Sequence, residues 1–463
     1  MTQKPRIDPG AIIASSGGVT YQQLLDREPN PVPDSLRDNT LPYLGSDNLP
    51  YSRYLSREFH EREVQKLWPK TWQMVCRESQ LPNPGDYFVY DITRYSIIVL
   101  RSPSGALRGF HNSCLHRGRM LKRGTGSATE LRCPYHSFAW DLDGGFKGAP
   151  CQWDFPHIDP DKFGLPEVRV DTWGGWVFVN MDAGAPPLAE YLGIIPEHFA
   201  RWEVEKRYVA AHVEKVIACN WKAALEAFIE SYHAIQTHPQ ILVYSGIDNS
   251  QYDVWGDHVS RTITTMGVVN PGHRDVYSEQ DCLDTILGTS ALVGQSGDGE
   301  HVDEGRTARE RIAEINYEDF SQQSGRDLSK IATHSEVMDS ILYLAFPNFA
   351  PWAGFLPMLT YRHRPNGDDH ESSIMDIYIL KPFPEGSERP EDAKTTRLGA
   401  DEPFSKATEL GEGLGRIFDQ DGANLPFVQR GMKASRTGEA VLADYQEVRI
   451  RHFHQTLDKY LDT

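Results

Sequence analysis

Two short runs of the sequence each place a cysteine beside a histidine, and they restrict the fold more than any other feature. One residue separates Cys114 from His116, and two residues separate Cys133 from His136. Thiolates and imidazoles close together in loops are typical metal ligands. Zinc fingers usually pair cysteine with cysteine and histidine with histidine, whereas each loop here supplies one of each. The mixed pattern therefore favours a [2Fe–2S] cluster with two thiolates on one iron and two imidazoles on the other, and structural zinc is the alternative.

Composition narrows the class of protein. With 463 residues we expect two or three domains. The six cysteines are too few and too scattered for a disulfide framework, so we expect reduced thiols. A net charge of −18 argues against a nucleic-acid partner. No apolar run is long enough to cross a membrane, and the N-terminus lacks the pattern of a signal peptide, so we expect a cytoplasmic protein without a membrane partner.

Changes in residue composition and in apolar patterns along the chain suggest three parts. Residues 1–50 are rich in Pro, Asp and Asn and predict an extended arm. Residues 51–186 predict a small β domain with a flanking helix at 55–70 that stops at Pro69. Residues 187–463 predict a larger domain of helices and strands, with a polar insertion at about 275–335 that is either a lid or a disordered excursion.

Individual elements follow from apolar patterns and turn residues. Strands are expected at 86–92, 95–100, 105–112, 176–182, 341–346 and 374–380. A helix is expected over 220–239, closed by Pro239, and an amphipathic helix over 439–462.

The segment between the two Cys/His loops is basic in an otherwise acidic chain. Its charged residues are Arg117, Arg119, Lys122, Arg123 and Arg132, against Glu130. These residues, which we name the basic collar, are expected to bind an acidic protein partner; a solvated loop is the alternative.

The runs CLHRG (114–118) and CPYHSFAWDLDGG (133–145) resemble the Rieske signature of ring-hydroxylating oxygenase α subunits. The resemblance implies a Rieske [2Fe–2S] cluster held by Cys114, His116, Cys133 and His136. Family members usually continue Cys-Pro-Tyr-His with Gly-Trp, whereas this chain has Ser-Phe, a change beyond the ligands.

A second donor set lies in NWKAALEAFIESYHAIQTHP (220–239), which contains His233 and His238. On a continuous helix Glu226, Glu230 and His233 share one face, and a bend near Gln236 is needed to bring His238 to it. Two satisfied histidines on an amphipathic helix are the alternative. The run is similar to the mononuclear-iron motif of the same family, which implies Fe(II) held by two imidazoles and one carboxylate.

The resemblance also suggests the carboxylate ligand and a bridging acid. RIFDQDGANLPFVQRGM (416–432) is similar to the family segment that supplies the third ligand, which implies Asp421, with Asp419 as the competitor. Most members carry Asp where this chain has Glu230, and Glu is found in the branch that acts on trimethylammonium compounds. In the family this acid links the cluster of one subunit to the iron of the next, so the resemblance implies a homotrimer, with or without a β subunit.

The family resemblance implies an α+β fold, with an N-terminal Rieske β domain and a C-terminal helix-grip catalytic domain built on an antiparallel sheet. It implies a terminal oxygenase that takes electrons from a separate NAD(P)H-linked ferredoxin or flavin reductase and uses O₂ on a small organic substrate. Dihydroxylation of an aromatic ring is the first interpretation. Monooxygenation of an O-methyl, N-methyl or quaternary-ammonium compound is the alternative, and a non-catalytic electron carrier is a third.

Substrate-pocket residues can be guessed only from their position near the second donor set. The apolar candidates, each as readily core, are Phe228, Ile229, Leu242, Val243, Phe346, Phe349 and Trp352. Arg362 and Arg364 are candidates for binding a substrate carboxylate.

Overall fold

The computed structural model describes residues 18–290, 293 and 299–462, and the chain divides into two compact units. The catalytic unit contains 193–364 and 370–459 together with the described residues up to Phe59. The cluster unit contains 60–192, 365–369 and the described residues from Tyr460 onward. Residues 1–17 of the predicted arm lie outside the described residues, and the described part of the arm contains two short helices, α2 (Tyr21–Leu25) and α3 (Asp34–Arg37).

The cluster unit is built on a seven-stranded sheet with the order β2-β11-β10-β5-β4-β3-β6. Its strands are β2 (Gln73–Arg77), β3 (Asp86–Ile92), β4 (Tyr95–Arg101), β5 (Leu107–His111), β6 (Thr125–Ser127), β10 (Glu167–Trp173) and β11 (Trp176–Asn180). All five residues of β11 are buried, as expected for a strand covered on both faces. The strands predicted in this unit are therefore confirmed.

A smaller three-stranded sheet follows the second Cys/His loop. It consists of β7 (Leu131–Arg132), β8 (Ala139–Trp140) and β9 (Phe146–Gly148) in that order. The predicted flanking helix is present as α5 (Arg57–Arg62), which continues as a π-helix over Glu63–Leu67 and ends before Pro69. The other helical segments of the unit are short: Glu78–Gln80, Gln152–Asp154, Pro160–Lys162 and α6 (Leu188–Tyr191).

The catalytic unit is built on an eight-stranded sheet with the order β13-β14-β15-β16-β17-β18-β12-β19. The strands are β12 (Tyr208–Ile217), β13 (Gln251–Trp255), β14 (Val259–Thr264), β15 (Ser340–Ala345), β16 (Phe349–Ala353), β17 (Met358–Asn366), β18 (Asp369–Lys381) and β19 (Thr395–Leu398). β19 pairs parallel with β12, whereas β12 pairs antiparallel with β18. A two-residue pairing joins β1 (Leu49–Pro50) to β20 (Glu439–Ala440). The predicted antiparallel sheet is confirmed.

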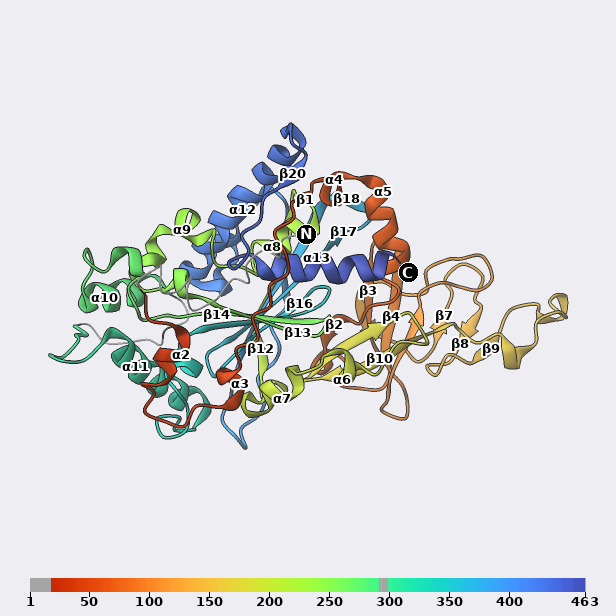
Figure 1. Cartoon of the computed structure of the whole chain (residues 1–463). Coiled ribbons are helices and arrows are strands. Elements are labelled where there is room, and N and C mark those ends of the chain that lie inside the picture. The colour runs from red at the N-terminus through yellow and green to blue at the C-terminus, as the bar shows by residue number, and fades with distance from the viewer. Residues whose placement is uncertain (1–17, 291–292, 294–298, 463) are drawn as a thin grey trace. The chain divides into compact units, whose positions relative to one another are not determined.

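Two long helices accompany this sheet (Figure 1). α12 (Gly411–Ala434) carries the predicted carboxylate segment. α13 (Val448–Leu461) lies against the β13–β14 hairpin, since Arg449 Nε donates to Ser260 Oγ at 3.0 Å and Thr456 Oγ1 donates to the Asp257 carbonyl at 2.6 Å. The C-terminal helix therefore begins nine residues later than the predicted residue 439 (448 − 439), because the chain first pairs in β20.

The remaining helices are short or lie at one end of the unit. They are α4 (Ser52–Leu55), α7 (Ile195–Phe199), α8 (Trp221–Glu226), α9 (Ala234–Thr237), α10 (Glu279–Thr289) and α11 (Ala308–Ser324), with short 3₁₀ turns at Ala200–Trp202, Val204–Lys206, Pro239–Val243, Ile247–Asn249, Pro271–His273, Ser335–Val337, Phe404–Lys406 and Thr408–Leu410. None of the described helices is both long and apolar enough to span a bilayer.

One predicted helix is wrong, and for 275–335 the disordered alternative is excluded in the described part. The helix expected over 220–239 is broken, because α8 ends at Glu226 and α9 covers only Ala234–Thr237. The stretch at 275–335 is not structureless in its described part, since α10 and α11 both turn apolar side chains inward, Leu283 and Ile312 among them. Polar composition concealed these buried faces, because the exposed side of each helix consists mainly of polar and charged residues.

Candidate metal centres

Two tight loops carry the Cys/His pairs of the cluster unit. The amide of Cys114 donates to the Arg119 carbonyl at 2.9 Å, and the Gly118 amide donates back to the Cys114 carbonyl at 2.9 Å. The second loop repeats the arrangement between Cys133 and Phe138, at 2.8 Å. These backbone hydrogen bonds fix the conformation of each loop, and the loop conformation in turn sets the direction of the cysteine side chain.

The side chains of Cys114 and Cys133 contact each other, and so do the rings of His116 and His136. Cys114 and Cys133 are 3% and 1% exposed, and the rings of His116 and His136 lie 4.7 Å apart. Nδ1 of His116 is buried and has no hydrogen-bond partner among the residues that the structure describes. A buried imidazole nitrogen without a partner is costly unless it ligates a metal, so the donor set fits a cluster with two thiolates and two imidazoles.

Phe138, one of the two departures from the family pattern, covers this site. Its ring stacks on His116 with a centroid distance of 4.6 Å and an interplanar angle of 12°. Phe155 closes the other edge of Phe138 at 5.3 Å, and Phe138 itself is 2% exposed. These aromatic rings cover one face of the His116 ring.

The basic collar is only partly available to a partner. Arg117, Arg123 and Arg132 are exposed, whereas Arg119 and Lys122 are half-buried. Burial lowers the pKa of Lys122, which lies over the Tyr87 ring. Arg132 and Lys147 both pair with Glu130, at 2.6 and 2.7 Å.

The second donor set forms where the predicted helix breaks. His233 precedes the first residue of α9, and His238 follows the last. Because only one helical turn separates them, both rings face α12, where Asp421 is buried. One nitrogen of each histidine and one oxygen of Asp421 lie within 4.8 Å of one another.

Hydrogen bonds fix the orientation of both imidazoles. Nδ1 of His233 donates to Glu230 Oε1 at 2.6 Å, and Nδ1 of His238 donates to Gln420 Oε1 at 2.8 Å. The Nε2 atoms of His233 and His238 lie 3.5 and 2.9 Å from Asp421 Oδ1. Two imidazoles and one buried carboxylate thus converge on one point, so the geometry fits a two-histidine, one-carboxylate metal site.

Electrostatics at this site also favour a cation. Burial lowers the pKa of His233, but hydrogen bonds to Asp421 and Glu230 outweigh burial and raise it to about 10. Burial raises the pKa of Asp421, and the two histidines more than reverse that effect.

The other acids considered in the sequence lie elsewhere. Asp419 turns away and accepts from the Ser405 amide at 3.3 Å. Glu226 does not share a face with Glu230 and His233, because α8 ends at Glu226; its carboxylate accepts from Tyr54 at 2.8 Å and lies 2.8 Å from His454. Gln420 was not singled out from the sequence, although its place beside the candidate ligand Asp421 was the available signal.

A mostly apolar cavity of about 160 Å³ opens beside His233, His238 and Asp421. Of the seven candidates named from the sequence, Phe228 and Trp352 line it. The other five are buried in the core: Ile229, Leu242, Val243, Phe346 and Phe349. Tyr244, Tyr361 and Phe418 complete the aromatic lining.

Arg362 and Arg364 do not line this cavity, contrary to the sequence-based suggestion. Arg362 pairs with Asp376 at 2.9 Å, and Arg364 pairs with Glu214 at 2.9 Å. Among the described lining residues there is no Arg or Lys. No Arg or Lys side chain among these described residues would therefore pair with a substrate carboxylate.

The fold and the two donor sets define a class of protein that joins a Rieske-type cluster domain to a sheet-based domain with a two-histidine, one-carboxylate site. Family comparison agrees. Residues 71–159 match the Rieske [2Fe-2S] domain, and residues 198–463 match the ring hydroxylating alpha subunit (catalytic domain). The second match spans more than half of the chain, so the chain belongs to the family of ring-hydroxylating oxygenase α subunits, whose cofactors are a Rieske [2Fe–2S] cluster and a mononuclear iron.

Curated relatives come from two branches. The chain is 30% identical over 200 residues to the glycine betaine monooxygenase oxygenase subunit of Pseudomonas aeruginosa, covering 42% of this chain and 46% of the relative. It is 33% identical over 194 residues to the carnitine monooxygenase oxygenase subunit of Escherichia coli, covering 41% and 52%. It is 32% identical over 188 residues to the biphenyl 2,3-dioxygenase subunit alpha of Rhodococcus jostii, covering 39% and 41%. The chain thus spans about half the length of the curated relatives it matches.

Solved structures share the fold over a greater length. A quaternary ammonium Rieske monooxygenase superposes with a TM-score of 0.64 at 18% identity, covering 91% of this chain and 99% of the other. A naphthalene 1,2-dioxygenase superposes with a TM-score of 0.61 at 18% identity, covering 91% and 94%. The predicted fold class is confirmed.

Proposed function

We propose that the protein is the terminal component of an oxygenase, which uses O₂ and electrons from a separate donor to oxidise a small organic substrate. The observation that carries this proposal is the apolar cavity beside His233, His238 and Asp421. An electron carrier needs no such cavity and no second metal site. When bound, the two cofactors would supply single-electron transfer and O₂ activation.

Each residue has a role in this proposal. Cys114, His116, Cys133 and His136 would hold the cluster, and His233, His238 and Asp421 would hold the mononuclear iron. Glu230 and Gln420 would keep Nδ1 of the two iron-ligating histidines protonated, so that each Nε2 lone pair faces the iron. The aromatic lining would exclude water from the face where substrate binds.

Metal analysis tests the ligand assignment. Asp421→Ala should lower mononuclear iron to a small fraction of one per chain and leave the cluster absorbance unchanged. Asp419→Ala is the matched control, because Asp419 is an acid on the same helix that turns to Ser405. Equal iron loss in both variants would remove Asp421 from its assigned role, and a colourless wild-type protein containing zinc would remove the cluster.

We propose an aromatic compound of about one ring as the first substrate class, with dihydroxylation of the ring as the reaction. The cavity volume of about 160 Å³ supports this size, since an apolar protein cavity of roughly 150 Å³ holds benzene. The described residues that line the cavity include no Arg or Lys, and this supports a neutral aromatic substrate over an aromatic acid.

A quaternary-ammonium compound is the second candidate, with monooxygenation and loss of an aldehyde as the reaction. Phe228, Trp352 and Tyr361 all line the cavity, so it offers several aromatic rings to a bound cation. Such an arrangement binds alkylammonium groups. Glu230 and the glycine betaine and carnitine monooxygenase relatives also support this candidate.

A single turnover under ¹⁸O₂ separates the two reactions. Reduced protein that contains both the cluster and the mononuclear iron would be mixed with benzene derivatives, methyl ethers and quaternary amines. The masses of the products would then be measured by mass spectrometry. Two labelled atoms in one product support ring dihydroxylation. One labelled atom, or a released aldehyde, supports monooxygenation.

We further propose that a ferredoxin or flavin reductase linked to NAD(P)H binds at the exposed members of the basic collar, which would place the reaction in the cytoplasm. Arg117 and Arg123 would contact the electron donor, because they are exposed, whereas Arg132 is already paired with Glu130. The cluster-reduction rate should fall steeply with ionic strength. Charge reversal at Arg123 should slow the reduction, whereas reversal at Arg436, exposed in the other unit, should not.

We propose a homotrimer, with or without a β subunit, in which Glu230 of one subunit meets the cluster histidines of its neighbour. Exposed apolar residues occur on both surfaces that would meet. In the cluster loops Leu115 and Tyr135 are 36% and 56% exposed, and near Glu230 the side chains of Tyr232 and Ile235 are 51% and 40% exposed. Sedimentation of the loaded protein gives the mass. A monomer that is fully active would contradict this assembly.

A further inference from the structure

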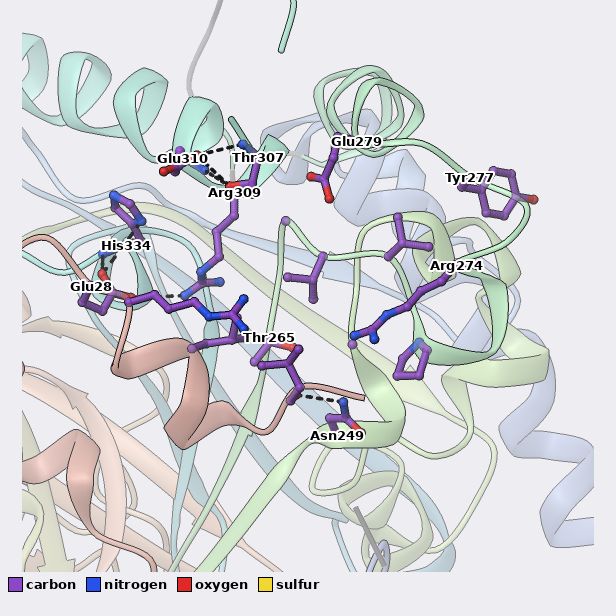
Figure 2. A pocket seen from close by; sticks show the side chains of 18 residues that line it. Glu28, Asn249, Thr265, Arg274, Tyr277, Glu279, Thr307, Arg309, Glu310 and His334 are labelled. Carbon is purple, nitrogen blue, oxygen red and sulfur yellow. Dashed lines mark hydrogen bonds and ion pairs between the residues drawn. The ribbon is translucent and has the colours of Figure 1, made fainter. Parts of the chain in front are cut away.

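A second cavity of about 400 Å³ lies within the catalytic unit and is lined by residues other than those of the metal cavity (Figure 2). Its lining is mixed. Leu24, Val268 and Val269 supply apolar surface, and three arginines, Arg27, Arg274 and Arg309, supply positive charge. The cavity is therefore shaped for a ligand with both an apolar part and a charged group.

The acids that line this cavity are already satisfied. Glu28 accepts from the Ser335 amide at 3.1 Å, Glu279 from the Ala308 amide at 2.7 Å, and Glu310 from the Thr307 amide at 2.7 Å. These carboxylates order helix starts and turns, so they are not free to bind a ligand cation.

The arginines differ in how far they are committed. Arg309 is buried and donates to both oxygens of Asp339, at 2.7 and 2.9 Å. Figure 2 shows Arg309 descending from the start of α11 on one side, while Arg274 extends into the cavity from the other. Arg27 is exposed and makes no ion pair or side-chain hydrogen bond with any residue in the described ranges. At least one guanidinium at this cavity thus lacks an acidic partner.

The cavity shares a wall with the metal cavity. The Gly246 amide donates to the Thr265 carbonyl at 2.9 Å, and Ser245 pairs with Met266 as an antiparallel bridge. Gly246 and Thr265 line the second cavity, whereas Ser245 and Met266 line the metal cavity. One layer of paired backbone separates the two spaces, so a ligand in one contacts the wall of the other.

We propose that this second cavity binds a small organic carboxylate, held by Arg27 and Arg274 with its apolar part against Leu24, Val268 and Val269. The flat fork of an arginine matches a carboxylate. Three nearby glutamates repel a doubly charged phosphate more strongly than a singly charged carboxylate, and an inorganic anion has no apolar part to place against Leu24, Val268 and Val269. The proposal does not depend on the reaction proposed for the metal centre.

Calorimetric titration of the metal-loaded protein with benzoate, and separately with inorganic phosphate, tests this site. Arg27→Gln and Arg274→Gln should each weaken benzoate binding by about tenfold or more, because a charge-assisted hydrogen bond is lost. Arg436→Gln removes the same charge from an exposed position outside the cavity and should leave binding unchanged. Arg27→Lys keeps the positive charge but not the two-pronged guanidinium, so it should weaken benzoate binding by less than Arg27→Gln does. A smaller loss in Arg27→Lys would show that the loss in Arg27→Gln is due to the missing charge and not to misfolding.

The Asp421→Asn variant excludes binding to the iron itself. Benzoate should still bind this variant with an affinity within about twofold of wild type, since the second cavity is intact. The proposal is overturned if benzoate does not bind, if Asp421→Asn abolishes binding while the arginine variants keep it, or if phosphate binds more tightly than benzoate.

Discussion

The ring of Phe138 lies parallel to the ring of His116, 4.6 Å away, and separates this candidate cluster ligand from the aromatic core of its unit. The core on the far side contains Trp140, Phe146 and Phe163. Phe138 therefore joins the packing of the small sheet to the orientation of one histidine. A change in this single side chain should alter both.

Phe138→Ala should destabilise the cluster unit by roughly 3–5 kcal/mol, the usual cost of removing a buried phenylalanine. It should also let the cluster bleach faster, because water gains access to His116. Urea unfolding and the decay of visible absorbance measure the two effects. Phe138→Trp, which restores the usual family residue, is the control and should keep both properties; an unchanged absorbance decay in Phe138→Ala would contradict the shielding role.

The neighbouring residue, Ser137, has a φ of 61°, in the left-handed region that favours glycine. The turn requires this conformation, because the Ser137 amide donates to the Cys133 carbonyl at 3.0 Å. Ser137→Gly should therefore stabilise the cluster unit by up to about 1 kcal/mol, after part of the gain is lost to the more flexible unfolded chain. Equilibrium unfolding measures the change. Ser137→Ala, which keeps the strain, should give no gain.

The cluster loops show how much a local pattern can predict. Cys114 and His116 are two residues apart, so one turn brings them together whatever surrounds it. The strands followed in the same way from alternating apolar residues and turn residues, as β3 (Asp86–Ile92) illustrates. Both depend only on neighbours in sequence.

The site of His233, His238 and Asp421 is harder to predict from sequence, because its geometry depends on contacts between residues far apart in the chain. An ideal helix places Glu226 beside Glu230, yet the chain leaves the helix after Glu226, whose carboxylate binds residues 172 and 228 positions away, Tyr54 and His454. Periodicity cannot reveal such a break. The partner of His238, Gln420, is likewise 182 positions away and became evident only in the fold.

Gln420 should control the affinity of the proposed iron site through His238. Gln420→Leu removes the acceptor for His238 Nδ1 and leaves the ring free to rotate, so we expect iron affinity to fall by about 10- to 100-fold. Iron content after dialysis against a graded chelator measures this affinity. Gln420→Glu keeps an acceptor at the same place and should retain most of the iron. Equal losses in the two variants would show that Gln420 acts through packing and not through its hydrogen bond.

Glu226 should make stability depend on pH. Burial, only partly offset by the hydrogen bond from Tyr54, raises the pKa of this carboxyl from 4.5 to about 8. Because the folded state holds the proton more tightly than the unfolded chain does, the protonated form stabilises the fold. That contribution is fully present below about pH 4.5 and is lost as pH rises through about 8.

Glu226→Gln replaces the protonated carboxyl with a neutral group that does not titrate. The variant should gain stability relative to wild type as pH rises from 5 to 8, by a few kcal/mol at most. Urea unfolding at several pH values, with both metals loaded, measures this difference. Glu409→Gln, at an exposed position of the same unit, is the matched control for replacing a glutamate with glutamine. A constant difference between wild type and Glu226→Gln would mean that Glu226 is ionised throughout and that Tyr54 and His454 stabilise its charge.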